Sequence, residues 1–257
     1  MKNIYCLLIV SFLCISSLLP AGAQTLSEKD FQVLNMNDGL SDNDIHSVAK
    51  DTEGFMWFGT GSGLNRYDGR TFKVFRMPGI SYRRIDRVVS LDTDYLLLRS
   101  EQNLFLFDKK YERFLPVCDS VSKQPVMFAD FVADSDGSCW GVSSGELSEV
   151  NFPSSYVQDT AFVSVRHVVN NSQSDPFVVL CMGEDGKMLY CASRNGTVYR
   201  FTPGQRQLKK VCDGQLSSGR WVSSLLNGDS FIWIPTVGDG LYGYDLTNGK
   251  LHHWQYI

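Results

Sequence analysis

Polar side chains that could bind a ligand are concentrated in segments that lead into, or begin, the apolar strands of this chain. Arginine can hold a carboxylate or sulfate with two parallel hydrogen bonds, aspartate can accept hydrogen bonds from sugar hydroxyls, and tryptophan can stack on a sugar ring. In chain order the candidates are Asp42, Asn43, Asp44, His46, Arg83, Arg84, Asp86, Arg87, Asp130, Arg166, His167, Arg220 and Trp221. The alternative for each is a solvated loop charge, because concave sites use few polar groups.

Two short motifs resemble those of catalytic or metal sites. Residues 141–145 satisfy the G-x-S-x-G pattern of hydrolases, whose serine must lie on a strand-to-helix turn beside a histidine and an acid. We expect a hairpin turn here, which favours a structural role. Residues 134–137 resemble the start of a calcium loop, but Gly145 stands where the last glutamate of such a loop is required. A turn between two strands explains this segment better.

The histidines and cysteines predict neither a metal site nor a cofactor. No two of the four histidines share metal-ligand spacing, and His252 and His253 would point to opposite faces of a strand. The cysteines beyond residue 23 are odd in number and lack C-x-x-C spacing; they are Cys118, Cys139, Cys181, Cys191 and Cys212. Those at 139 and 191 are expected to act as small core residues. Whether Cys181 and Cys191 pair across neighbouring strands is left open.

The elements that must position these residues recur along the chain. A turn containing Asp, Asn or Gly precedes an apolar strand, and a tight turn and a second strand follow. The copies are anchored on Trp57, Leu97, Trp140, Leu189 and Trp233, which gives a period of roughly 40–50 residues. Short strands with this period predict an all-β fold, a β-propeller with about five four-stranded blades. The expected blades are 40–78, 85–117, 126–165, 175–212 and 220–256.

The first repeat shows how a blade is expected to be built. Residues 45–49 form the innermost strand, 55–60 and 64–67 the two middle strands, and 71–75 the outer strand. Blades stack on one another, so the middle strands are buried on both faces and apolar at nearly every position. In propellers, the links between blades and the turns between the middle strands gather at one mouth of the central channel. This topology places the polar candidates at that mouth.

Residues 31–35 look like an outer strand that lacks the three other strands of its blade. Propellers commonly close by pairing such an N-terminal strand with the last blade, yet the fifth blade already has an outer strand. We therefore expect an incomplete propeller, whose missing strands would lie beyond Ile257. The alternative is a closed ring of five blades in which 31–35 is an extra edge strand.

The first 23 residues of the 257 predict a signal peptide. Lys2 supplies a positive start, residues 4–19 are largely apolar, and Ala21, Gly22 and Ala23 form a small-residue cleavage site. An uncleaved anchor is disfavoured because the apolar run is short. We expect an exported domain of residues 24–257 without a membrane span. A net charge of −4 argues against nucleic-acid binding, which needs clustered lysine and arginine.

The first repeat also resembles a known family. Residues 37–45, 51–60 and 63–69 are similar to the two-component regulator propeller repeat, with its D-G-L-S-x-N, D-x-x-G-x-[IL]-W-[FI]-G-T and G-L-x-x-[YF]-D-G segments. The fifth repeat fits in part, with Pro235 in place of a glycine. The resemblance implies the periplasmic sensor region of hybrid two-component system proteins, which respond to glycan fragments. It implies an oligosaccharide ligand. The incomplete propeller would expose apolar blade faces, so we expect a second copy or further blades as partners.

Two other functions stay open at this stage. No kinase motif or nucleotide-binding glycine box is present, so we expect no enzyme activity in this chain. A glycan-cleaving propeller would need two carboxylates about 5–10 Å apart, for which Asp44, Asp86 and Asp130 are the candidates. A non-catalytic interaction scaffold is the other alternative.

Overall fold

The computed structural model of the chain describes residues 32–79, 84–92, 94–133, 139–153, 156, 159–170, 175–184, 186–214, 216, 219–228 and 230–255. The chain divides into two units, Met1–Leu34 and Asn35–Ile257. The predicted signal peptide, Arg83 and the turn at 134–137 lie outside the described residues.

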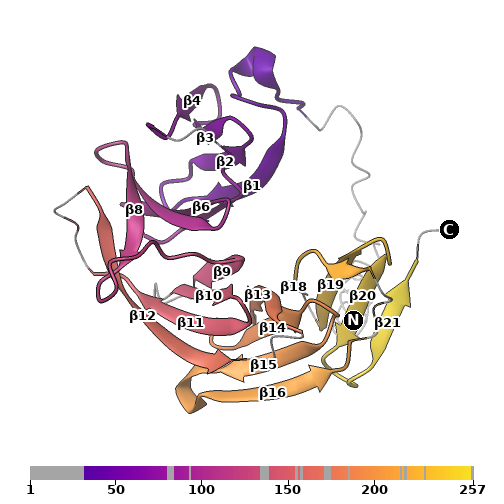
Figure 1. Ribbon diagram of the computed structural model, residues 1–257. Coiled ribbons are helices and arrows are strands. Elements are labelled where there is room, and N and C mark those ends of the chain that lie inside the picture. Colours follow the sequence, from indigo (N-terminus) through magenta and orange to yellow (C-terminus); the bar gives the residue numbers. More distant parts are fainter. Residues whose placement is uncertain are drawn as a thin grey trace, which may run out of the picture. The chain divides into compact units, whose positions relative to one another are not determined.

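Five antiparallel sheets of four or five strands follow one another in chain order (Figure 1). The outer strands of the second and third also pair with each other in parallel, which joins these two into one eight-stranded sheet. The first contains β1 (Ile45–Lys50), β2 (Met56–Thr60), β3 (Gly63–Tyr67) and β4 (Phe72–Phe75). The second contains β5 (Arg87–Ser90), β6 (Tyr95–Ser100), β7 (Asn103–Asp108) and β8 (Arg113–Asp119). The third contains β9 (Asp130–Ala133), β10 (Cys139–Ser143), β11 (Glu146–Asn151) and β12 (Ala161–Asn170).

The fourth sheet contains β13 (Phe177–Met182), β14 (Leu189–Ser193), β15 (Val198–Thr202) and β16 (Gln207–Cys212). The fifth contains β17 (Trp221–Val222), β18 (Leu226–Gly228), β19 (Phe231–Val237), β20 (Leu241–Asp245) and β21 (Leu251–Trp254). The helical segments in the described chain are the 3-10 turns η2 (Met36–Asp38) and η3 (Pro203–Gln205). The predicted all-β propeller is confirmed, and each sheet is one blade.

Strand alternation explains why successive blades stack. In β6, Leu96 and Leu98 are buried against the first blade, in a cluster with Trp57, whereas Leu97 is buried against the third blade with Phe131. Successive side chains of a strand point to opposite faces, so a continuous apolar run serves two interfaces at once. Similar clusters join the third blade to the fourth and the fourth to the fifth.

The motif of the first repeat has a local physical cause. One oxygen of Asp51 accepts hydrogen bonds from the backbone N–H groups of Glu53 and Phe55, both at 3.0 Å, and the other accepts one from the indole of Trp57 at 2.8 Å. Lys109 of the second blade lies 3.5 Å from the same carboxylate. Burial alone would raise the pKa of Asp51, but the hydrogen bond from Trp57 and the charge of Lys109 lower it below its usual value. The aspartate and tryptophan of the motif thus fix the turn and join two blades.

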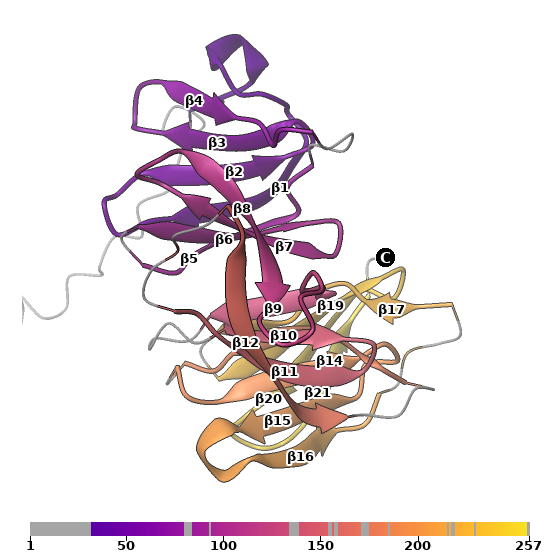
Figure 2. The same cartoon turned by 60° about the vertical axis from the view of Figure 1, so that its left-hand side comes forward.

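The outer strand of the third blade is longer than predicted. Ala161–Val163 pair in parallel with Val117–Asp119 of β8, and the rest of β12 pairs with β11 as far as Asn170 (Figure 2). This blade was expected to end at 165, with Arg166 and His167 in a link between blades. Val168 and Val169 are β-branched residues, which favour strands, and the pairing with β11 continues past them.

Residues 31–35 were expected to form an outer strand, and this expectation is wrong for the part that is described. Gln32–Asn35 have no strand structure; Phe31 is not described. The Asn35 side chain accepts a hydrogen bond from the N–H of Asn37, and Asp38 accepts one from the N–H of Asn35. This cap uses backbone groups that a strand would need for pairing.

Within the described residues, no helix has the length and apolar character needed to cross a bilayer.

Candidate functional site

Five charged residues gather where the innermost strands of the second and third blades begin, and we call them the arginine cluster. They are Arg84, Asp86, Arg87, Arg99 and Asp130. Arg84 Nε lies 2.5 Å from Asp86 Oδ1, and Arg87 Nη1 lies 3.4 Å from Asp130 Oδ1. Arg87 and Arg99 occupy facing positions on β5 and β6, so their side chains leave the sheet on the same face.

Backbone groups hold the carboxylates of the cluster in place. Asp86 Oδ2 accepts a hydrogen bond of 2.7 Å from the N–H of Glu101, in the turn between β6 and β7. Asp130 Oδ2 accepts one of 3.1 Å from the N–H of Leu180, on β13 of the fourth blade. The cluster therefore connects three successive blades.

The cluster combines buried charge with unused hydrogen-bonding capacity. Asp130 is 7% exposed, and burial raises its pKa, opposed by the charges of Arg87 and Arg99. Burial lowers the pKa of Arg99, opposed by Asp130 and Asp86. The Nε atoms of Arg87 and Arg99 are buried and have no hydrogen-bond partner among the described residues. Three guanidinium groups face two carboxylates, so the cluster has an excess of positive charge that suits an oxyanion.

The candidates before and within β1 form a network of their own. Asn43 accepts a hydrogen bond of 3.0 Å from the N–H of Met36, and Asp44 lies 3.2 Å from Nε2 of His46. Asp42 accepts hydrogen bonds from the N–H of Asp44 at 3.0 Å and from the hydroxyl of Ser62 at 2.9 Å. These contacts fix the entry to the first blade, and they involve no member of the arginine cluster.

The remaining candidates lie on other elements. Arg166 forms an ion pair with Glu149 of β11, whereas His167, the next residue of β12, contacts Ser148 and Glu146. Arg220 precedes β17 and lies against Gly238, and Trp221 begins β17 with 43% of its surface exposed. The structure thus brings together Arg84, Asp86, Arg87 and Asp130. The contacts described above for the other described candidates are with residues outside this cluster.

Arg99 was not among the residues expected from the sequence. It lies on a middle strand of the second blade, whereas the topology of a propeller directed attention to the links between blades. A charged residue that directly follows Leu96, Leu97 and Leu98 in a buried strand is the signal that could have found it.

The structure bears on the catalytic and metal motifs as well. Ser143 ends β10 and Ser144 lies in the hairpin turn to β11, with a left-handed φ of 50°, which is not a strand-to-helix elbow. In the described part of the chain, no group of three or more His, Cys, Asp or Glu residues could hold a metal ion.

The cysteine pairing that the sequence left open is also answered. Cys181 and Cys191 are both free. Cys181 is buried between the fourth and fifth blades and Cys191 between the third and fourth. They lie on opposite faces of one sheet, which explains why they do not pair.

Comparison with known proteins agrees with the repeat and the fold. Residues 39–62 match the family described as two component regulator propeller. Histidine kinase P4 of Formosa agariphila is 38% identical over 78 residues, which are 30% of this chain and 5% of that protein. The extracellular domain of a protein described as a hybrid two component system from B. thetaiotaomicron has a TM-score of 0.63 at 17% identity, over 86% of this chain and 31% of that one.

A second extracellular domain from the same organism, of a protein described as a one component system, has a TM-score of 0.48 at 16% identity, over 82% of this chain and 33% of that one. The chain thus spans about a third or less of the length of these relatives. The resemblance found in the sequence is confirmed: the chain carries a two-component regulator propeller repeat, within a β-propeller like that of the extracellular domain of a hybrid two component system.

Proposed function

We propose that this chain is an exported ligand-binding sensor domain of a two-component system, and that its arginine cluster binds an acidic group of a glycan fragment. Support for the sensor role comes from the regulator propeller repeat and from the extracellular domain with the same fold. The observation that carries the ligand class is the pair of buried Nε atoms, on Arg87 and Arg99, without a hydrogen-bond partner among the described residues.

A carboxylate or sulfate entering the cluster would accept hydrogen bonds from guanidinium groups that Asp86 and Asp130 now only partly satisfy. Arginine is suited to this role because its planar fork matches the geometry of such anions. Arg87 belongs to the second blade, whereas its ion-pair partner Asp130 belongs to the third and accepts a hydrogen bond from Leu180 of the fourth. A bound anion that competes for Arg87 would therefore change an interaction between blades, which offers a route for a signal to a second copy or to further domains.

Calorimetry tests the proposal with the mature chain and three oligosaccharides of equal length, one with uronic acid, one sulfated and one neutral. We expect at least one acidic oligosaccharide to bind more tightly than the neutral one, and Arg99→Gln to weaken that binding about tenfold, as expected for loss of a charged hydrogen bond. Arg70→Gln, at an exposed turn, is the matched control and should bind like the wild type. Equal affinity for all three oligosaccharides, or an unchanged affinity in Arg99→Gln, would refute the proposed ligand class.

A further inference from the structure

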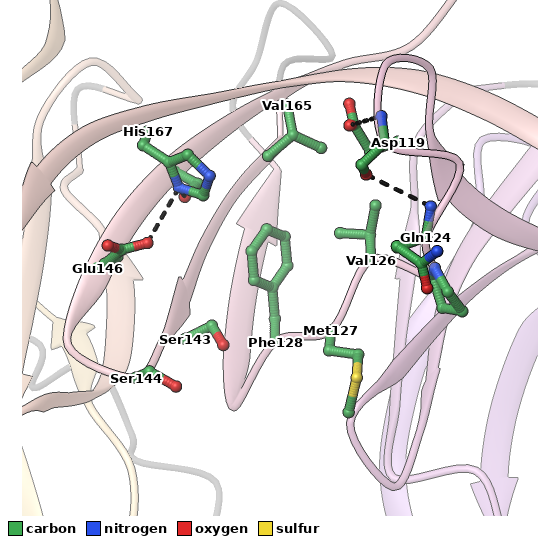
Figure 3. Close-up of a pocket in the computed structure, with 13 residues that line it drawn as sticks. Asp119, Gln124, Val126, Met127, Phe128, Ser143, Ser144, Glu146, Val165 and His167 are labelled. Atoms are coloured by element: carbon green, nitrogen blue, oxygen red, sulfur yellow. Dashed lines mark hydrogen bonds and ion pairs between the residues drawn. The ribbon is translucent and has the colours of Figure 1, made fainter.

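A cavity lies between the turn that follows β8 of the second blade and the third blade. Its volume is about 310 Å³, within the range of roughly 300–1,000 Å³ that is usual for small-molecule sites. Figure 3 shows Glu146 and His167 on one side, Asp119 and Gln124 on the other, and Phe128 between them. We call this cavity the interblade pocket.

The charge of the interblade pocket is opposite to that of the arginine cluster. All of its lining residues are described, and none is lysine or arginine, whereas Asp119 and Glu146 are both acidic. Lys123, which neighbours the lining, holds its ammonium group 4.6 Å from the centre of the Phe162 ring. Hydrogen bonds from Ser122 lower the pKa of Asp119, so this carboxylate is ionised at neutral pH.

Each oxygen of the Glu146 carboxylate has one partner: Oε1 accepts a hydrogen bond of 3.1 Å from Nδ2 of Asn170, and Oε2 faces His167. A carboxylate oxygen can accept more than one hydrogen bond, so both can still accept from a ligand. Nδ1 of His167 lies 3.2 Å from Glu146 Oε2 and 2.9 Å from the hydroxyl of Ser148. Both contacts use the same ring nitrogen, so this is not the arrangement of a catalytic triad, in which the serine and the acid bind different nitrogens. The side chains of His167 and Glu146 are 70% and 39% exposed, so a ligand can reach them.

The rest of the lining offers an apolar surface and hydroxyl groups. Met127 and Val165 line the cavity beside the ring of Phe128, and Ser143 and Ser144 add two hydroxyls. Apolar walls with a few convergent polar groups are typical of sites for small ring-shaped ligands.

We propose that the interblade pocket binds a small hydroxylated amine, of which an amino sugar is the model compound. Its ammonium group would lie by Glu146, its hydroxyls by the serines and Gln124, and the apolar face of its ring against Met127 and Phe128. This site differs from the arginine cluster, which selects the opposite charge.

A short turn joins the two sites. Glu101 donates its N–H to Asp86 of the arginine cluster, and the next residue, Gln102, accepts a hydrogen bond of 2.8 Å from the N–H of Phe128 in the pocket. Asn103 pairs with Met127 in an isolated bridge. Occupation of one site can therefore alter the turn that supports the other.

Titration of the mature chain with glucosamine, glucose and N-acetylglucosamine, followed by calorimetry, tests this proposal. We expect glucosamine to bind about tenfold more tightly than the two neutral sugars, and Glu146→Gln to remove that preference. Glu184→Gln, an exposed glutamate outside the lining, is the control and should leave binding unchanged. Circular dichroism verifies that both variants are folded.

Absence of glucosamine binding at millimolar concentration, or equal binding by Glu146→Gln, would overturn the proposal. Arg99→Gln separates the two sites, because it should lose the acidic oligosaccharide and keep glucosamine. Failure of the acidic oligosaccharides to bind would refute the proposed function without affecting the result for the pocket.

Discussion

The arginine cluster and the interblade pocket both contain charged side chains in contact with one another. The charges of the cluster are more deeply buried than those of the pocket. The cluster joins three blades through Asp130, whose side chain is 10% exposed, and the pocket keeps the Glu146–His167 pair on one blade and in contact with water. A buried charge must be satisfied by partners, whereas an exposed charge is stabilised by water. The difference suggests that the charges of the cluster support both structure and binding, and that those of the pocket are free to serve binding alone.

The largest effect is expected from Asp130→Ala. This change leaves the N–H of Leu180 without its acceptor and deprives Arg87 of its ion-pair partner. We expect the free energy of unfolding to fall by about 3–5 kcal/mol, the range for breaking a buried ion pair, as measured by urea denaturation. Asp44→Ala, whose side chain is 70% exposed, is the control and should cost less than about 0.5 kcal/mol. Equal losses in both variants would remove the distinction between buried and exposed charges.

An intermediate effect is expected from Gly141→Ala, which acts directly on the pocket and reaches the arginine cluster only through the turn between β6 and β7. A Cβ atom at this position would overlap the ring of Phe128, so the ring must move. We expect a loss of about 1–3 kcal/mol in stability, as for other overpacked sites, together with a loss of glucosamine binding and retained binding of acidic oligosaccharides. Gly204→Ala, where the added Cβ meets no atom, should be close to neutral. Unimpaired glucosamine binding in Gly141→Ala would show that Phe128 does not shape the site.

The smallest effect is a difference in pH dependence. Burial raises the pKa of Asp130 above its unfolded value, so the folded state holds this proton more tightly, and stability should fall as the pH rises from about 4 through the folded pKa. Asp119 behaves in the opposite way: its pKa is lowered from 3.8, so its contribution is present above that value and is lost as the pH falls through the folded pKa.

Urea denaturation of the wild type, Asp130→Asn and Asp119→Asn between pH 3 and 7 measures this difference, over a range set by the reference pKa of aspartate of about 3.9. The free energy of unfolding of the wild type minus that of Asp130→Asn should decrease as the pH rises. The corresponding difference between the wild type and Asp119→Asn should increase as the pH rises. If both free-energy differences changed with pH in the same direction, burial would not dominate the pKa of Asp130 while hydrogen bonding dominates that of Asp119.

Several features of the fold could be read from residues that are close in the chain. Asp51, Gly54 and Trp57 predicted a turn and a strand, because the carboxylate can reach the N–H groups and the indole within a few residues. The alternation of apolar residues predicted strands buried on both faces. The candidate site was found in part, since Arg84, Asp86 and Arg87 lie just before or at the start of an innermost strand, where the topology of a propeller places a channel mouth.

Other features required knowledge of distant neighbours. Arg99 joins the arginine cluster because β6 pairs with β5, and the interblade pocket exists because β8 and β12, more than forty positions apart in the sequence, lie side by side. Arg166 and His167 were expected together in one link between blades, but they lie on a strand, and alternation directs them to different partners, Glu149 and Glu146.

The sequence by itself determined the repeat, the strand pattern and the turns, because hydrogen bonds over a few residues and the two-residue period of a strand specify them locally. Tertiary structure decided which charges meet, how deeply Asp130 is buried and where a cavity remains between two blades. These properties depend on the register and packing of separate sheets, and the free energy of a charge depends on everything that surrounds it.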